Sequence, residues 1–212
     1  AMPGHNQEDC YMPNNYDDKF RGPISLRSAL AQSIIIPAVK LFYLAGPGSS
    51  LKTAEDMGIS TLGETNRYGL TLVIGGGEVT LLDMASAYGV FANDGVRNPY
   101  TGILEVQDSA GKILEQYQPK LQEILTKNTA LTISDILSDE KSRVPTFGSR
   151  SVLYIPGKDV AVKTGTTNNN KDAWTIGYTP SIVVGVCAGN NDNVAMKKAG
   201  AAVAGPNWNK FM

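Results

Sequence analysis

The 212 residues are enough for one domain with a substantial core, and 42% apolar with 18% charged residues excludes a disordered chain. The 19 basic and 20 acidic residues nearly cancel, and no long run of either sign suggests a nucleic-acid or membrane-surface partner. The one histidine, His5, and the two cysteines, Cys10 and Cys187, lack metal-ligand spacing, so we expect neither a metal site, a cofactor nor a histidine-based triad.

The N-terminal part predicts irregular chain over residues 1–20 followed by two helices that meet at an elbow. Ser25 is predicted to cap the first helix, and Pro37 to end it. Because proline suits the first turn of a helix, the second helix is expected over residues 38–45. Ser33 is therefore predicted to lie at the elbow.

The middle of the chain alternates helical and strand-like patterns. Thr80 followed by Asp83 resembles a capping box, and Gly75-Gly76-Gly77 indicates a turn, since no Gly-Lys-Ser/Thr follows to make a phosphate cradle. The predicted elements are a helix over residues 50–57, a helix over 80–95, a β-hairpin over 101–118 and a helix over 129–138.

The last third is rich in β-branched residues. Three runs, residues 160–166, 173–178 and 182–189, are separated by turn residues and predict antiparallel strands. Helices that precede a block of strands favour an α+β domain over a doubly wound sheet. Trp174, Ile176 and Tyr178 alternate along one strand and are predicted to face the core.

The first of these strands carries the most informative residues. Lys163, Thr164, Gly165 and Thr166 stand where packing alone would favour Val or Ile. At a sheet edge, free N–H groups, a glycine that permits close approach, a lysine and hydroxyls would form a site for an anion such as a carboxylate. The alternative is a solvated edge strand guarded by its lysine.

The segment Lys163-Thr164-Gly165-Thr166-Thr167 resembles the Lys-Thr-Gly motif of serine penicillin-binding proteins and β-lactamases. Its surroundings resemble the bifunctional, class A peptidoglycan synthases in particular. The segments that carry this likeness are Arg27, Ala29-Leu30, Pro37 to Leu41, Ala87-Tyr88, Phe91 to Gly95, Asp172 to Pro180, Gly205 to Trp208 and Phe211-Met212.

The resemblance implies the fold of the penicillin-recognising serine enzymes, an α+β domain with helices packed on an antiparallel sheet. It also implies a D,D-transpeptidase of peptidoglycan synthesis, in which a serine attacks a D-alanyl-D-alanine stem peptide, forms an acyl-enzyme and passes it to an amine. β-Lactams mimic that donor. Such enzymes act in the periplasm, at the outer face of the bacterial cytoplasmic membrane.

The same resemblance implies roles for individual residues. Ser33 would be the hydroxyl of a Ser-x-Asn motif and relay a proton to the leaving group, with Lys163 tuning it. Thr164 and Thr166 would hold the substrate carboxylate, and Gly165 would allow the substrate to approach the strand. The Thr166 N–H would supply half of the oxyanion hole.

The chain departs from the family pattern at the nucleophile. No Ser-x-x-Lys sequence precedes Ser33, and the later matches beginning at Ser49, Ser109 and Ser138 are interpreted as a helix start, a hairpin turn and a helix end. Residues 1–212 are therefore expected to be a partial transpeptidase domain that is inactive alone, with the nucleophile and any membrane anchor further upstream. The partial sheet would expose an edge, so we expect self-association.

A second departure is Ile35, which stands where the family has asparagine and cannot hydrogen-bond a substrate amide. This keeps open a degenerate, non-catalytic domain that binds a peptide or a partner; a serine β-lactamase is a further alternative. Cys187 replaces a usual aromatic residue and is predicted to be a buried structural thiol. Asp139-Glu140 is predicted to be a solvated helix end.

Overall fold

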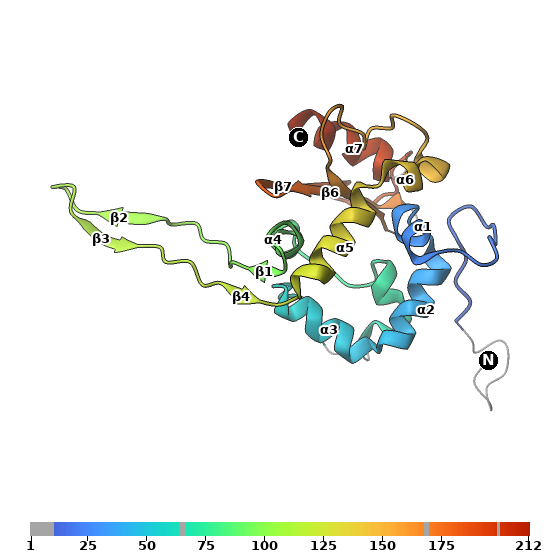
Figure 1. Ribbon diagram of the computed structural model, residues 1–212, viewed down its shortest axis with the longest axis horizontal. Coiled ribbons are helices and arrows are strands. Elements are labelled where there is room, and N and C mark those ends of the chain that lie inside the picture. Colours follow the sequence, from blue (N-terminus) through green and yellow to red (C-terminus); the bar gives the residue numbers. More distant parts are fainter. Residues whose placement is uncertain (1–10, 64–66, 168–169, 199) are drawn as a thin grey trace.

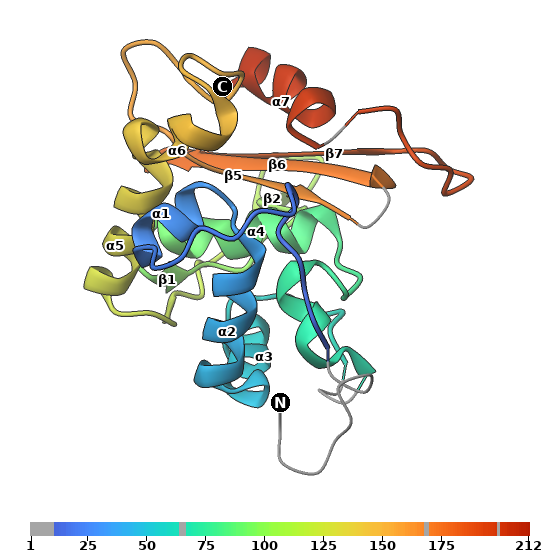
Figure 2. The ribbon, with the colours of Figure 1, turned by 90° about the vertical axis from the view of Figure 1, so that its right-hand side faces the viewer.

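A computed structural model describes residues 11–63, 67–167, 170–198 and 200–212, so His5 and Cys10 lie outside the described residues. It is an α+β domain, as predicted, with a three-stranded sheet between helices (Figures 1 and 2). The helices are α1 Leu26–Ala31, α2 Ile35–Ala45, α3 Pro47–Asp56, the 3-10 helix η3 Gly69–Ile74, α4 Leu81–Ala92, α5 Lys127–Ser138, α6 Glu140–Phe147 and α7 Gly200–Phe211. The strands are β1 Val96–Arg97, β2 Glu105–Gln107, β3 Ile113–Gln116, β4 Gln122–Glu123, β5 Ala161–Thr166, β6 Asp172–Thr179 and β7 Ile182–Gly189.

The predicted elbow between the first two helices is confirmed. Ser25 caps α1 by accepting a hydrogen bond from the Ser28 N–H. The prediction that Pro37 ends the first helix is wrong, because α1 already ends at Ala31 with a turn at Ser33, and α2 begins at Ile35, before Pro37. Pro37 lies in the first turn of α2, where its missing N–H costs nothing.

The three predicted C-terminal strands form an antiparallel sheet in the order β5-β6-β7. Helix α7 covers one face, while α4 and α5 pack against the other, with α1 beside α5 (Figure 2). Within the described residues both β5 and β7 have a free edge, which the expected self-association requires; the association itself stays a prediction.

Alternation along β5 sends neighbouring side chains to opposite faces of this sheet. Val162 joins a cluster with Trp208 of α7, which is fully buried. Ala161 joins Tyr178 and Leu137 of α5 on the opposite face. Gly177 of β6 lies directly beneath the Trp208 ring, since a Cβ there would stand 2.3 Å from the ring atom Cζ2.

The helix after Thr80 is confirmed in part. Thr80 caps α4 by accepting from the Asp83 N–H at 3.0 Å, but the Asp83 carboxylate accepts from Ser60 N–H and Oγ and does not complete a capping box. These hydrogen bonds from Ser60 lower the pKa of buried Asp83. Asp83 therefore tethers the loop after α3 to α4.

The predicted hairpin forms a long two-stranded ribbon that projects from the body (Figure 1). Strands β1 and β4 pair at its base and β2 and β3 towards its tip. Every residue of β2 and β3 is exposed. The turn at residues 108–111 follows the predicted chemistry, because Asp108 Oδ1 accepts from the N–H groups of Ala110 and Lys112.

Three predictions about side chains need correction. Asp139-Glu140 is not a solvated helix end, because Asp139 caps the unpredicted helix α6 and Glu140 pairs with buried Arg143. Cys187 is exposed on β7, although it shares a strand face with Gly185, where a Cβ would meet Leu81 and Ala85 of α4. Ile176 and Tyr178 are buried as predicted, whereas Trp174 is half-buried.

None of the helices in the described part of the chain is both long and apolar enough to cross a bilayer.

Candidate functional site

Ser33 and Lys163 meet across the elbow and the edge strand. Lys163 Nζ donates to Ser33 Oγ at 2.6 Å and to the Thr164 carbonyl at 2.8 Å, although Ser33 is 130 residues away in sequence. Ser33 is exposed and Lys163 is half-buried. Since an ammonium group only donates hydrogen bonds, Ser33 Oγ accepts from it, and the Ser33 hydroxyl proton is free to be donated elsewhere.

Burial lowers the pKa of Lys163 to about 8 from its ordinary value of 10.5. Desolvation disfavours the ammonium form, and the structure describes no carboxylate paired with it that would offset this effect. Near neutral pH the group is therefore mainly charged but close to titration. Such a lysine can both polarise a hydroxyl and exchange a proton with it.

The backbone at Ser33 explains how its hydroxyl reaches the strand. Ser33 N–H donates to the Leu30 carbonyl and Ile34 N–H to the Ala29 carbonyl, which is the hydrogen-bond pattern of a Schellman motif. Ser33 occupies the left-handed position of this motif, with φ 59°. Glycine is the usual residue there, so the serine is held in a conformation that its Cβ disfavours.

We expect Ser33→Gly to be more stable than Ser33→Ala by about 1 kcal/mol, the reverse of the usual order of these residues next to a helix. Both variants remove the hydroxyl and its contact with Lys163, so the comparison isolates the left-handed backbone. Urea unfolding followed by circular dichroism measures the difference. Equal or greater stability of the alanine variant would contradict the strain argued for this residue.

The outer edge of β5 presents free backbone groups. Thr167 N–H donates to the Asp172 carbonyl, and hydrogen-bonded pairs alternate along an antiparallel ladder, so Gly165 and Lys163 also bond towards β6. The N–H and C=O groups of Thr164 and Thr166 must therefore point away from the sheet. The contact of Lys163 with the Thr164 carbonyl agrees with this assignment.

On β5, the Thr166 hydroxyl has a hydrogen-bond partner, while the space beside Gly165 is limited by a neighbouring strand. Thr166 Oγ1 accepts from the Gly200 N–H at 3.0 Å, so its own proton remains available to a ligand. Gly165 lies opposite Trp174 of β6, and a Cβ at Gly165 would approach Trp174 Cβ to 3.3 Å. A side chain at Gly165 would thus be crowded against Trp174 of the neighbouring strand.

Ile35 and the serines of the three Ser-x-x-Lys matches all lie at helix ends or in a turn. Ile35 is the first residue of α2 and is half-buried. Ser49 lies in the first turn of α3, Ser109 in the hairpin turn and Ser138 at the last position of α5. These three serines therefore lie at a helix start, a turn and a helix end, as predicted.

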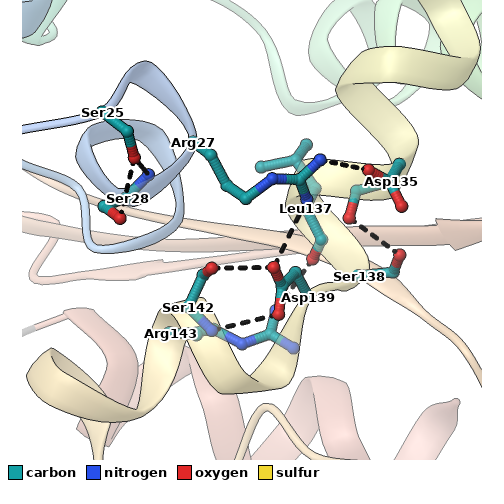
Figure 3. Close-up of polar contacts among 9 residues, drawn as sticks. All are labelled: Ser25, Arg27, Ser28, Asp135, Leu137, Ser138, Asp139, Ser142 and Arg143. Carbon is teal, nitrogen blue, oxygen red and sulfur yellow. Dashed lines mark hydrogen bonds and ion pairs between the residues drawn. The ribbon is translucent and has the colours of Figure 1, made fainter.

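Sequence reasoning missed the polar contacts that surround the elbow. Asn15, which is buried, accepts from the Ile36 N–H through Oδ1 at 3.1 Å and donates to the Lys19 carbonyl at 2.7 Å. Arg27 of α1 bridges Asp135 of α5 and Asp139 at the start of α6 (Figure 3). An asparagine in irregular chain and an arginine on a helix gave no signal of these partners.

The most prominent surface groove lies away from this site. This groove, about 710 Å³, is lined by residues such as Arg150, Tyr154 and Lys210 near α7 and touches neither Ser33 nor Lys163. The described residues also bring together no cluster of His, Cys, Asp or Glu that could hold a metal. The chemistry available is that of Ser33, Lys163 and an open strand edge.

Residues 2–212 match the family model described as the penicillin binding protein transpeptidase domain. The chain is 34% identical over 204 residues to penicillin-binding protein 1A of Aquifex aeolicus, covering 95% of this chain and 27% of that protein. It is 34% identical over 201 residues to penicillin-binding protein 1A/1B of Bacillus subtilis, covering 87% of this chain and 21% of that protein. The chain thus spans about a quarter of the length of these relatives.

Solved structures give the same result. Penicillin-binding protein 1A of Haemophilus influenzae superposes with a TM-score of 0.81 at 25% identity, covering 100% of this chain and 37% of that chain. PonA1 of Mycobacterium tuberculosis in complex with penicillin V has a TM-score of 0.74 at 24% identity, covering 93% of this chain and 57% of that chain, which supports the fold. By sequence and fold, the chain belongs to the penicillin-binding protein transpeptidase family.

Proposed function

We propose that this chain is part of a peptidoglycan D,D-transpeptidase that cross-links stem peptides through a serine acyl-enzyme and binds β-lactams. In this proposal residues 1–212 form a partial transpeptidase domain, and the protein acts outside the cytoplasm, at the outer face of the bacterial membrane. The observation that carries it is the contact of Lys163 Nζ with Ser33 Oγ beside the free edge of β5.

In the proposed reaction, Ser33 and Lys163 move a proton. When the attacking serine bonds to the carbonyl carbon and the C–N bond of the donor peptide breaks, the Ser33 hydroxyl gives its proton to the leaving nitrogen and regains one from the Lys163 ammonium. The proton released by the attacking serine restores the charge of Lys163, so the step balances. The hydrogen bond from Lys163 to Ser33 Oγ supports this direction of transfer, because it leaves the hydroxyl proton free. The lowered pKa of Lys163 supports it too, since the ammonium gives up its proton more readily.

The edge of β5 binds the donor in this proposal. The outward N–H of Thr166 donates to the oxyanion, and the hydroxyls of Thr164 and Thr166 donate to the substrate carboxylate. Gly165 lets the substrate lie along the strand. No residue described here combines the position and the chemistry of the attacking serine, which we therefore assign to a Ser-x-x-Lys segment outside residues 1–212.

The decisive experiment is covalent labelling by a fluorescent penicillin with intact-mass analysis. We expect no adduct on this chain and one adduct per molecule on a version extended upstream through the Ser-x-x-Lys segment, blocked by unlabelled penicillin. An adduct on the short chain would contradict our assignment of the nucleophile. Two folded but unlabelled chains would favour a non-catalytic binding domain disabled at Ile35.

A further inference from the structure

The contact between Ser33 and Lys163 depends on how the elbow is held over the sheet. Ser33 carries a positive φ that its side chain disfavours, so local energetics alone do not keep it in place. A strained residue persists only where the surrounding structure holds it. Two polar anchors in this structure hold the elbow, one on each side.

On the side of α2, the anchor is Asn15. Helix α2 begins after Ile34, whose side chain cannot cap the exposed N–H groups of the first turn. Asn15 supplies the cap from 21 residues away, through the hydrogen bond from Ile36 N–H to Oδ1. Its other hydrogen bond, to the Lys19 carbonyl, fixes the rotation of the amide. A buried asparagine with both ends used determines where α2 starts.

On the side of α1, the anchor is Arg27. Its guanidinium pairs with Asp135, and it reaches Asp139 Oδ2 at 3.3 Å (Figure 3). Asp139 in turn accepts from Ser142 N–H and Oγ, and these bonds together with Arg27 lower the pKa of Asp139. Arg27 therefore bonds α1 to the rigid junction of α5 and α6, and α5 packs on β5, the strand of Lys163.

We propose that Asn15 and Arg27 are positioning residues that clamp the two helices of the elbow and thereby set Ser33 Oγ against Lys163 Nζ. Neither touches the substrate in the proposed reaction. The inference deepens the proposed function and rests on it only for its effect on acylation; the effect on the Ser33–Lys163 contact is independent of it.

The first test measures the contact itself in this chain. We expect the nuclear Overhauser effect between the Ser33 Hβ and Lys163 Hε protons to disappear in Asn15→Leu and Arg27→Met. Asn15→Asp should weaken it less than Asn15→Leu, because the carboxylate still accepts from Ile36 N–H at a helix N-terminus but loses the hydrogen bond to the Lys19 carbonyl. Two controls, Asp17→Asn and Lys52→Met, each break exposed ion pairs on neighbouring segments and should leave the signal unchanged.

The second test measures acylation by a fluorescent penicillin in the upstream-extended protein. A displacement of about 1 Å costs roughly 100-fold in rate, so we expect the second-order rate constant to fall about 10-fold to 100-fold in Asn15→Leu and Arg27→Met, with Asn15→Asp between Asn15→Leu and the parent. If Asn15→Leu does not fold, Asn15→Ser, whose side chain is too short to reach Ile36, takes its place.

The outcomes separate the clamp from the proposed function. Loss of the Ser33–Lys163 signal together with slower acylation supports both. Loss of the signal without any acylation in the extended parent supports the clamp and contradicts the proposed function. An unchanged signal in folded Asn15→Leu or Asn15→Ser, or a smaller loss in Asn15→Leu than in Asn15→Asp, overturns the positioning role even if the variants melt at lower temperature.

Discussion

Lys163→Met should slow acylation of the upstream-extended domain by about 100-fold to 10,000-fold, the range expected for losing a general acid–base group. The same substitution should raise the melting temperature of the 212-residue chain near neutral pH, because methionine fills the space of the lysine stem without burying an ammonium group. Penicillin labelling kinetics and thermal unfolding by circular dichroism measure the two effects. A lysine with only a structural role would not combine slower acylation with a higher melting temperature when it is replaced.

The pH dependence of this gain has a defined sign. Burial sets the pKa of Lys163 at about 8 in the folded chain against 10.5 as the ordinary value. Below pH 8 the lysine is protonated in both states, and the cost of burying its charge acts in full. Between the two values the unfolded chain binds more protons, so the stability contributed by this group rises with pH. The advantage of Lys163→Met should therefore shrink from pH 7 to 10.5.

A matched control is Lys158→Met, since Lys158 is an exposed lysine in the turn before β5. It should change neither acylation nor the melting temperature measurably. Acylation at the parental rate in Lys163→Met would remove Lys163 from the proposed proton transfer, whatever happened to stability.

The second large effect concerns Trp208. Trp208→Ala should lower the free energy of unfolding by about 3–5 kcal/mol, the usual cost of removing a fully buried large aromatic ring. The ring packs on one face of the sheet above Gly177 and beside Val162, so its removal leaves a cavity in that cluster. Urea unfolding measures the change, with Trp174 remaining as the fluorescent reporter.

Two companion variants make this result specific. Phe211→Ala, on the same helix but at a residue that is 72% exposed, should change stability by less than about 0.5 kcal/mol. Trp208→Phe should cost less than Trp208→Ala, because phenylalanine keeps most of the apolar contact and removes an indole N–H that has no partner in the described residues. Comparable losses for Phe211→Ala and Trp208→Ala would show that α7 frays before the core opens.

The elbow and the strands β2, β3 and β5 to β7 were predictable because their signals are local, whereas the short strands β1 and β4 were not predicted. Alternating β-branched residues and turn chemistry define β5 to β7, and Pro37 restricts where α2 can start. Helices α6 and α7 were not predicted, since Pro145 and Pro206 lie inside them and argue against helix. Tertiary contacts, such as those of Trp208, decide these segments.

Of the candidate site, the reacting side chains could be named from the sequence, but the residues that hold them in place could not. Ser33 and Lys163 were chosen by resemblance to a family, and the structure brings them into contact; their catalytic roles stay predictions. The anchors Asn15 and Arg27 were not predictable, because their partners are distant in sequence and hydrogen bonds of this kind leave no periodic pattern. Exposure of Cys187 was missed because strand alternation gives the face of a side chain but not how far along the strand the covering helix reaches.

The projecting ribbon of β1 to β4 also affects how the molecule moves through solvent (Figure 1). A slender arm adds hydrodynamic drag with little mass, so a single copy should elute from a sizing column ahead of a compact protein of equal mass. Early elution therefore does not by itself indicate a dimer. Sedimentation equilibrium, which depends on buoyant mass and not on shape, is the appropriate measure of the expected self-association.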